Sequence, residues 1–177
     1  IGTILDISHR KFMERELKSL SITDTLTGLY YRRGFIALAE QQFKQAERKK
    51  DGLTLFFADL DDLKQINDSL GHTVGDEALV EVAEVFQEVF RKMDIIGRVG
   101  GDEFAVLAPD VPREHADLVE KRLHDQLAVH NARANRDFAI YLSAGMAYYD
   151  PEQPCSLDEL ISRADSLIYE QKRAKQL

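Results

Sequence analysis

Hydrophobic residues along the chain follow two spacings, one typical of strands and one typical of helices. Strands are predicted where apolar residues run together or alternate, over 53–59, 94–99, 103–108 and 138–149. Helices are predicted where apolar residues share one helical face, over 35–43, 63–70, 76–92, 112–130 and from Ser156 onward. The order is helix, strand, helix, hairpin, helix, strand, helix. It predicts an α/β (α+β) sandwich with a mainly antiparallel central sheet flanked by helices, not a doubly wound fold.

Several residues are expected to start, stop or shape these elements. Gly71 is predicted to end the helix over 63–70. Ser156 and Glu159 have the spacing of a capping box for the last helix. Gly145 is a candidate for a bulge in the strand over 138–149. The buried face of the last helix is predicted at Leu160, Ile161, Ala164, Leu167 and Ile168.

The first twenty residues are patterned differently from the rest. Residues 2–8 alternate like a final strand, and 9–20 are charged and helical, with an apolar stripe at Met13, Leu17 and Leu20. The stripe suits a short coiled-coil seam or, equally, a solvated helix with one apolar line. We predict that residues 1–20 end a preceding domain and that 21–177 form one domain. Because the sequence starts at Ile1, we expect a piece of a longer protein.

The net charge and the cysteine count limit the classes of ligand and the cellular compartment that fit this chain. The net charge of −8 argues against a general nucleic-acid binder or a direct membrane binder, both of which need a basic face. A phosphorylated ligand would therefore need a local site with a cation. The single cysteine, Cys155, leaves no intramolecular disulfide framework and fits a reducing cytosol. We expect a cytoplasmic domain, which is compatible with membership of a larger, membrane-associated sensor protein.

Acidic residues gather where two predicted strands end. Asp59 ends the apolar strand over 53–59, and Asp102 and Glu103 follow two glycines at the tip of the hairpin. If the hairpin pairs beside that strand, Asp59 and Asp102 can approach each other. Converging carboxylates repel unless a cation joins them, and oxygen ligands suit Mg²⁺ shared with phosphates. This is the chemistry of nucleotidyl transfer. Taken alone, the acids also suit a polar hairpin tip, and Asp61 and Asp62 suit the first turn of a helix.

Three stretches together resemble one family: DTLTGLYYRR (24–33), DLDDLKQINDSLGHTVGDEAL (59–79) and GGDEF (100–104). Their order and spacing resemble the GGDEF family of diguanylate cyclases, roughly from Ser21 to Lys175. The resemblance implies condensation of two GTP into cyclic di-GMP with release of pyrophosphate. It also implies a fold similar to class III nucleotidyl cyclases and polymerase palm domains. Since one site holds one GTP, it implies a homodimer. Residues 1–20 resemble the end of a PAS sensor domain that runs into a signalling helix.

The resemblance implies a role for each acid of the hairpin and the neighbouring strand. Asp59 and Asp102 would bind Mg²⁺ or Mn²⁺, with the carbonyl of Leu60 as a further ligand. Glu103 would assist the metal or help to deprotonate the attacking 3′-hydroxyl, which requires a base within hydrogen-bond reach.

GTP contacts are implied next to these acids. The backbone amides of Asp62 and Leu63 open the helix after Asp59, and a helix N-terminus is a natural phosphate seat. Lys64 and Lys172 resemble the family's phosphate-contacting lysines, and Lys64 is counted with the catalytic groups. A lone lysine is otherwise typical of a solvated surface.

Two further residues are implied in guanine recognition. Asn67 and Asp76 match family positions that read the guanine edge. A base without the complementary groups would leave them unpaired, at a cost of roughly 1–3 kcal/mol each. The alternatives are a satisfied core amide for Asn67 and a helix N-cap for Asp76.

The segment RKMD (91–94) precedes Gly100 at the spacing of the family's inhibitory site. Arg91 and Asp94 would bind cyclic di-GMP, because a guanidinium can grip phosphate and stack on guanine. Arg122 on the next helix could complete this pocket. The alternative for Arg91 and Asp94 is an i,i+3 ion pair at a helix end.

Three positions depart from the family pattern: Tyr31 replaces an asparagine, Leu63 a phenylalanine, and Gln176 an arginine for the triphosphate. They leave two functions in competition. The first is an active, metal-dependent cyclase with product inhibition. The second is a catalytically weak or inactive regulatory module that binds GTP or cyclic di-GMP. A third, a cyclase of another nucleotide, is disfavoured by Asn67 with Asp76.

Overall fold

The sheet at the centre of the molecule has five strands in the order β1-β3-β4-β2-β5. The computed structural model describes residues 22–109, 111–133, 136 and 138–175. The strands are β1 (Tyr30–Tyr31), β2 (Leu53–Leu60), β3 (Ile95–Arg98), β4 (Glu103–Ala108) and β5 (Leu142–Tyr149). Every pairing is antiparallel except that of β1 with β3. The predicted class, a mixed α/β fold with a mainly antiparallel sheet between helices, is confirmed.

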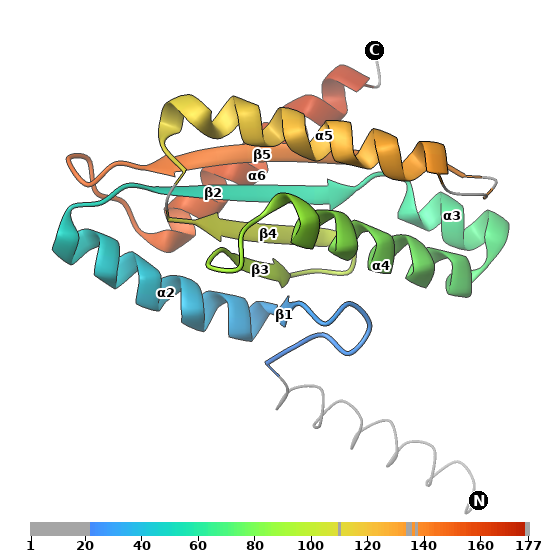
Figure 1. Cartoon of the computed structure of the whole chain (residues 1–177), viewed down its shortest axis with the longest axis horizontal. Coiled ribbons are helices and arrows are strands. Elements are labelled where there is room, and N and C mark those ends of the chain that lie inside the picture. Colours follow the sequence, from blue (N-terminus) through green and yellow to red (C-terminus); the bar gives the residue numbers. More distant parts are fainter. Residues whose placement is uncertain (1–21, 110, 134–135, 137, 176–177) are drawn as a thin grey trace, which may run out of the picture.

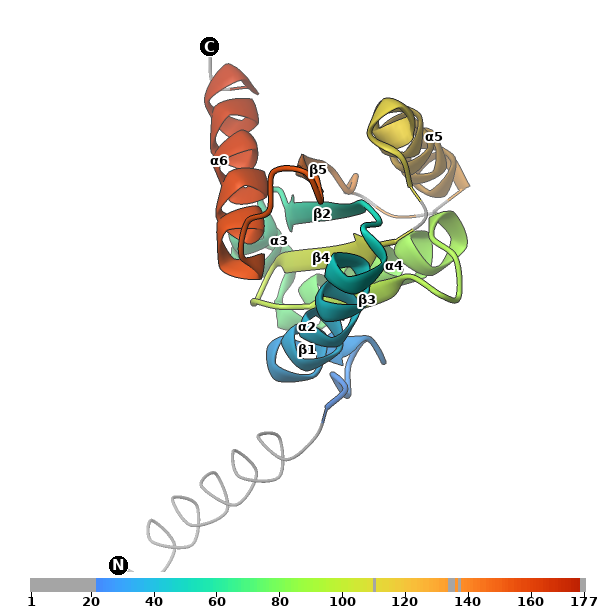
Figure 2. The ribbon, with the colours of Figure 1, turned by 90° about the vertical axis from the view of Figure 1, so that its left-hand side faces the viewer.

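Helices cover both faces of the sheet. They are α2 (Arg32–Lys49), α3 (Leu63–Leu70), α4 (His72–Val89), the 3₁₀ turn η1 (Arg113–His115), α5 (Ala116–Arg133) and α6 (Leu157–Lys175). One apolar cluster joins α4 and α5 to the sheet, and a second joins α2 and α6 to the opposite face. Figure 2 shows α6 on one side of the sheet and α5 on the other. No helix in the described ranges is long and apolar enough to cross a membrane.

The central strand explains where the acids end up. All but one of the eight residues of β2 are buried, because the strand has neighbours on both edges and helices on both faces. The exception is Asp59, next to the last residue of β2. The strand therefore carries its one carboxylate to the end where α3 begins (Figure 1).

Two local signals in the sequence are confirmed. Gly71 ends α3 as predicted, with a positive φ of 94° and its N–H donating to the Asn67 carbonyl. The capping box is present: the Glu159 carboxylate accepts from the Ser156 N–H at 2.8 Å, and the Ser156 hydroxyl accepts from the Glu159 N–H at 3.1 Å.

Other predictions about the elements were wrong. Strand β5 begins at Leu142 rather than at 138, and the two-residue strand β1 was not foreseen, because it is too short for a period. Gly145 is not at a bulge: it pairs in register with Phe57. A Cβ there would collide with the Ala164 carbonyl of α6, so this glycine permits close packing of helix on strand. Leu167 is 42% exposed, so it stands at the margin of the buried face of α6 rather than within it.

The helix N-cap alternative for Asp76 was also wrong. Helix α4 begins at His72, so Asp76 lies inside the helix and does not cap it. The stripe at Met13, Leu17 and Leu20, and the expected boundary at residue 20, lie outside the described residues.

Candidate active site

The acids of β2 and of the β3–β4 turn lie at one end of the sheet. Asp59 pairs with Glu103 in the β2–β4 register. The N–H of Leu60 donates to the carbonyl of Asp102 at 2.9 Å, which ties the turn to the end of β2. The predicted approach of Asp59 and Asp102 is therefore confirmed. Three carboxylates from two elements are gathered here by backbone pairing alone.

Burial and neighbouring negative charge raise the pKa of Asp59 and of Glu103. Burial raises the pKa of Asp59 most, and the charges of Asp102 and Asp61 add to it, against the opposing effect of Lys172. Burial likewise raises the pKa of Glu103, with further increments from Asp102 and Asp59. The site therefore holds more negative charge than its own cations balance, which favours a bound cation.

Lys172 is a cation that already reaches this group. It projects from α6, and its Nζ lies 2.6 Å from Asp59 Oδ1. Burial opposes the charged form of Lys172, but Asp59, Asp61 and Asp102 outweigh it and raise the pKa of the ammonium. The side chain therefore stays protonated beside the carboxylates. This contact spans 113 residues of sequence and brings a predicted phosphate-contacting lysine to the predicted metal ligands.

The carboxylate oxygens of this site suit a hard cation such as Mg²⁺, which takes only some of its ligands from the protein. In the part of the chain that the structure describes, no three His, Cys, Asp or Glu side chains are grouped closely enough to hold a metal ion. Asp59, Asp102 and Glu103 are therefore not preassembled as three side-chain ligands of one ion. One or two carboxylates with substrate phosphates is the usual way in which proteins bind Mg²⁺, so the residues fit that metal.

Helix α3 starts directly beyond these acids. Asp62 precedes it with a left-handed φ of 58°, a conformation that non-glycine residues rarely adopt, and Leu63 is its first residue. Amides in the first turn of a helix have no partner within the helix, and a phosphate is favoured beside them. Lys64 is exposed on the same turn. The side chain of Asp61 is engaged by Ser143, whose hydroxyl donates to Asp61 Oδ1 at 2.7 Å.

Asn67 and Asp76 are neighbours through Gly75. The Asn67 amide lies where a Cβ on Gly75 would stand, so the side chain of α3 packs on the backbone of α4. Asp76 is the next residue along α4, is exposed, and lines an open cavity of about 540 Å³ with Gly100 and Gly101. The structure thus brings the two predicted guanine-reading residues together beside the acidic turn.

One group of residues at this turn was not assigned from the sequence. Asp24 is 2% exposed and accepts from the Thr27 hydroxyl at 2.7 Å and from Arg98 Nη1 at 2.9 Å. Arg98 also donates to the Gly101 carbonyl from Nη2 at 2.7 Å and from Nε at 3.1 Å. Tyr31 makes a further side-chain hydrogen bond to Asp24. The signal was the stretch 24–33, which carried the resemblance but no role for its aspartate.

Arg91 and Asp94 lie at a second cavity, of about 440 Å³, whose lining shares no residue with the first. The Arg91 N–H donates to the Asp94 carboxylate at 2.7 Å, and the Asp94 N–H to the Arg91 carbonyl at 3.0 Å. This turn follows α4 and contributes both residues to the cavity lining. Arg122 does not line that cavity; its Nη2 lies 3.4 Å from the carbonyl of Glu88 in the last turn of α4. The third member of the predicted inhibitory group is therefore beside the helix rather than in the pocket.

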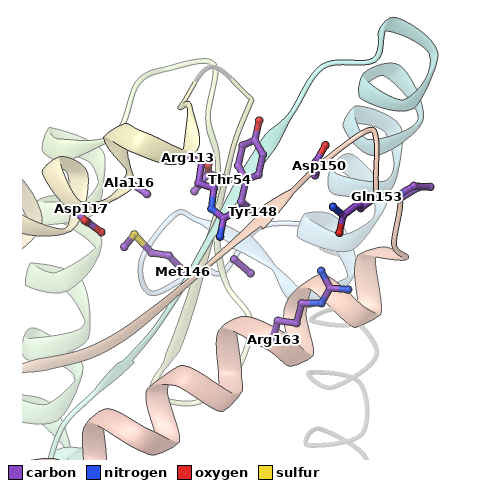
Figure 3. A pocket seen from close by; sticks show the side chains of 11 residues that line it. Thr54, Arg113, Ala116, Asp117, Met146, Tyr148, Asp150, Gln153 and Arg163 are labelled. Atoms are coloured by element: carbon purple, nitrogen blue, oxygen red, sulfur yellow. The ribbon is translucent and has the colours of Figure 1, made fainter.

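A third, larger cavity of about 790 Å³ lies at the other end of β5 (Figure 3). Arg113 and Arg163 line it from η1 and α6, and Asp117 and Asp150 contribute the opposite charge. Tyr148 of this cavity pairs with Thr54 near the start of β2, whereas Asp59 is near its end. The cavity is therefore separated from the acids by the length of the strand.

Comparison with known proteins agrees with this geometry. The family model "Diguanylate cyclase, GGDEF domain" matches residues 21–176. Over 161 residues the chain is 35% identical to the probable diguanylate cyclase DgcC of Escherichia coli K12, a match that covers 91% of this chain and 43% of DgcC. The chain thus spans less than half the length of that relative.

Two solved structures are similar throughout. Diguanylate cyclase SiaD of Pseudomonas aeruginosa, crystallised with its activator SiaC, matches with a TM-score of 0.79 and 30% identity over 98% of this chain and 68% of that chain. The GGDEF domain of DgcB from Caulobacter crescentus, in complex with c-di-GMP, matches with a TM-score of 0.76 and 31% identity over 87% of this chain and 91% of that chain. Since the family model covers most of the sequence, the chain belongs to the diguanylate cyclase GGDEF-domain family.

Proposed function

We propose that this domain condenses two GTP into cyclic di-GMP and releases pyrophosphate. The observation that carries the proposal is the convergence of Asp59, Asp102 and Glu103 with Lys172 at the end of β2. Each group suits one requirement of nucleotidyl transfer: a metal seat, a base and a cation for phosphate.

In this proposal the residues divide the work. Asp59 and Asp102 hold Mg²⁺ or Mn²⁺ with the Leu60 carbonyl, and the metal supplies charge neutralisation for the triphosphate. Lys172, with Lys64 and the amides of Asp62 and Leu63, binds phosphate oxygens. When the triphosphate enters, the ammonium of Lys172 can exchange its contact with Asp59 for one with phosphate.

Glu103 is the proposed base for the attacking 3′-hydroxyl. Its raised pKa makes it a better proton acceptor than an ordinary surface glutamate. Asn67 and Asp76 read the guanine edge from the α3–α4 junction. One chain supplies one such set of residues, so two copies must face each other, and we propose a homodimer that forms at least during catalysis.

We further propose that the Arg91–Asp94 cavity binds the product and inhibits the enzyme. A guanidinium beside a carboxylate can take both the phosphate and the guanine edge of cyclic di-GMP. To contact a ligand in this cavity, the side chain of Arg122 would have to leave the Glu88 carbonyl of α4. Replacing Arg91 and Asp94 by alanine should relieve product inhibition without slowing the first turnovers; unchanged inhibition would remove this site from the proposal.

The competing function is a binding module with little or no turnover. It is favoured by Gln176, which stands where the family has an arginine for the triphosphate. Incubation with GTP and Mg²⁺, with products resolved by chromatography, separates the two. Cyclic di-GMP from the parent and none from Asp102→Ala supports the cyclase. No product at high protein concentration, after bound cyclic di-GMP is stripped, supports the module.

We also propose which segment precedes the domain and where in the cell the domain acts. We propose that residues 1–20 connect a PAS-like sensor to the cyclase through a signalling helix. A cytoplasmic location, without nucleic acid or direct membrane contact, agrees with the net charge of −8 and with a GTP substrate.

A further inference from the structure

The last turns of α6 are held to the sheet by polar rather than apolar contacts. Among the side chains of α6 that the structure describes, Ile168 is the last that is buried. Gln171 and Lys172 follow it and are half-buried. Lys172 reaches Asp59 of β2, and Gln171 reaches the backbone of β5. The place of the Lys172 ammonium therefore depends on contacts made beyond the apolar face of the helix.

Gln171 uses both ends of its amide group. Its Oε1 accepts from the Ala144 N–H at 3.0 Å, and its Nε2 donates to Glu120 Oε1 at 3.2 Å. Ala144 lies on β5, the last strand of the described sheet, and Glu120 lies on α5. Figure 2 shows α5 and α6 on opposite sides of the sheet, so this side chain joins the two helices across the outer edge of β5. An amide that pairs with an edge N–H and with a second helix restrains how its own helix is rotated on the sheet.

The contact of Gln171 with β5 lies next to the contact of Lys172 with β2. Gln171 directly precedes Lys172 along α6. Ala144 pairs with Ala58 in the β2–β5 register, and Ala58 directly precedes Asp59. The amide contact and the Lys172–Asp59 contact are therefore neighbouring ties between one helix and one pair of strands. Loss of either tie leaves the other to hold this part of α6.

We propose that Gln171 is a positioning residue for Lys172 when the triphosphate binds. This inference rests on the proposed function, in which the Lys172 ammonium leaves Asp59 for a phosphate oxygen. At that step the helix loses its tie to β2, whereas the two hydrogen bonds of Gln171 are made to protein atoms and stay. The turn that carries Lys172 is then already ordered, so less conformational entropy is lost when the lysine binds phosphate.

The test measures the dissociation constant of a non-hydrolysable GTP analogue with Mg²⁺ by calorimetry. Gln171→Met keeps the length of the side chain and removes both hydrogen bonds, so the constant should rise about fivefold, as expected for the loss of an ordinary hydrogen bond. Gln126→Met is the matched control, because Gln126 also joins two helices through a glutamate, from α5 to Glu88 of α4. It should stay within about twofold of the parent.

A double-mutant cycle shows whether Gln171 acts through Lys172. In Lys172→Met the analogue binds without the ammonium. Adding Gln171→Met to that variant should therefore change the dissociation constant by less than about twofold. A merely structural role would instead add its full loss of affinity in both backgrounds.

An exchange of the two polar partners tests the hydrogen bonds themselves. Gln171→Glu keeps an acceptor for the Ala144 N–H but places a second carboxylate beside Glu120, so the analogue should bind more weakly. Adding Glu120→Gln restores a donor and an acceptor in reversed order, and it should recover the parent constant to within about twofold. If Gln171→Met does not fold, these two variants decide in its place.

Each outcome separates the role of Gln171 from the proposed function. A loss of affinity in Gln171→Met that disappears in the Lys172→Met background supports the positioning role. Parent-like binding by Gln171→Met, or an equal loss in both backgrounds, overturns that role and leaves the proposed function standing. If the domain binds the analogue but makes no cyclic di-GMP from GTP, the cyclase proposal falls while the dissociation constants still decide on Gln171. If the parent does not bind the analogue, both fall together.

Discussion

The two ends of strand β2 offer a direct comparison, because acidic residues gather near both. At the far end, the 790 Å³ cavity contains two arginines and two aspartates, so its charges balance. At the near end, the carboxylates of Asp59, Asp61 and Asp102 act on the ammonium of Lys172, and Glu103 lies in the same group of acids. Burial and the charges of neighbouring carboxylates raise the pKa of Asp59 and Glu103 there. Partly buried carboxylates that repel one another therefore mark the end at which a metal and a triphosphate would bind.

The largest effect is expected from Asp59→Asn. The change removes one of two carboxylates in the proposed metal seat, which should lower the rate of cyclic di-GMP formation about 10³-fold or more. Asp150→Asn at the far end is the matched control and should stay within about twofold of the parent. Initial rates at saturating GTP and Mg²⁺ measure both. An equal loss of rate in Asp59→Asn and Asp150→Asn would contradict the assignment of the metal seat to the Asp59 end of β2.

Glu103→Gln tests the electrostatic part of the comparison. Loss of the proposed base should lower kcat by about 10²-fold or more. The melting temperature of the free domain should rise at neutral pH, because an acid with a raised pKa destabilises the fold once it ionises. That penalty is absent below its ordinary pKa of 4.5 and is complete above the raised pKa, so the gain should vanish as the pH falls. Melting curves between pH 4 and 8 check this sign; a gain that grows towards low pH would contradict it.

The sequence predicted most of what backbone periodicity can encode. The strand of buried residues and the hairpin were clear because their apolar runs are long, and the acids were found because they end those runs. Gly145 and Leu167 were misjudged because their environment is set by the helix–strand packing of α6, which no local pattern reports.

The candidate site was predicted in part, for a similar reason. Lys172 was inferred only from the resemblance, since its contact with Asp59 joins residues 113 positions apart. Asp24 received no role, because its partner Arg98 is 74 positions away and becomes its neighbour only through the β1–β3 pairing. Arg122 was suggested only because it lies on the next helix, and a helix assignment does not report that its side chain turns towards the Glu88 carbonyl.

Lys172→Met compares two cations on one helix. Lys172 reaches Asp59 from α6, whereas Arg163 lines the far cavity from the same helix. A hydrogen bond to a charged group contributes roughly 1.5–3 kcal/mol, so loss of the lysine should raise KM for GTP by about 10- to 100-fold. Arg163→Met should change KM less than about twofold. Steady-state kinetics with both variants decides, and an equal rise in KM would mean that helix packing rather than charge is responsible.

The smallest expected effect is that of Gly75→Ala. This change would affect substrate recognition only by displacing the side chain of Asn67. An added Cβ would occupy the position of the Asn67 amide, a flexible group that can move, and alanine otherwise suits the interior of α4. The melting temperature should therefore hold or rise while guanine recognition weakens. We expect the preference for GTP over ATP, measured as the ratio of kcat/KM values, to fall about 10-fold, since one displaced hydrogen-bonding group is worth about one power of ten. An unchanged preference in a folded variant would show that Asn67 does not read the base, and it would leave guanine recognition at this end to Asp76.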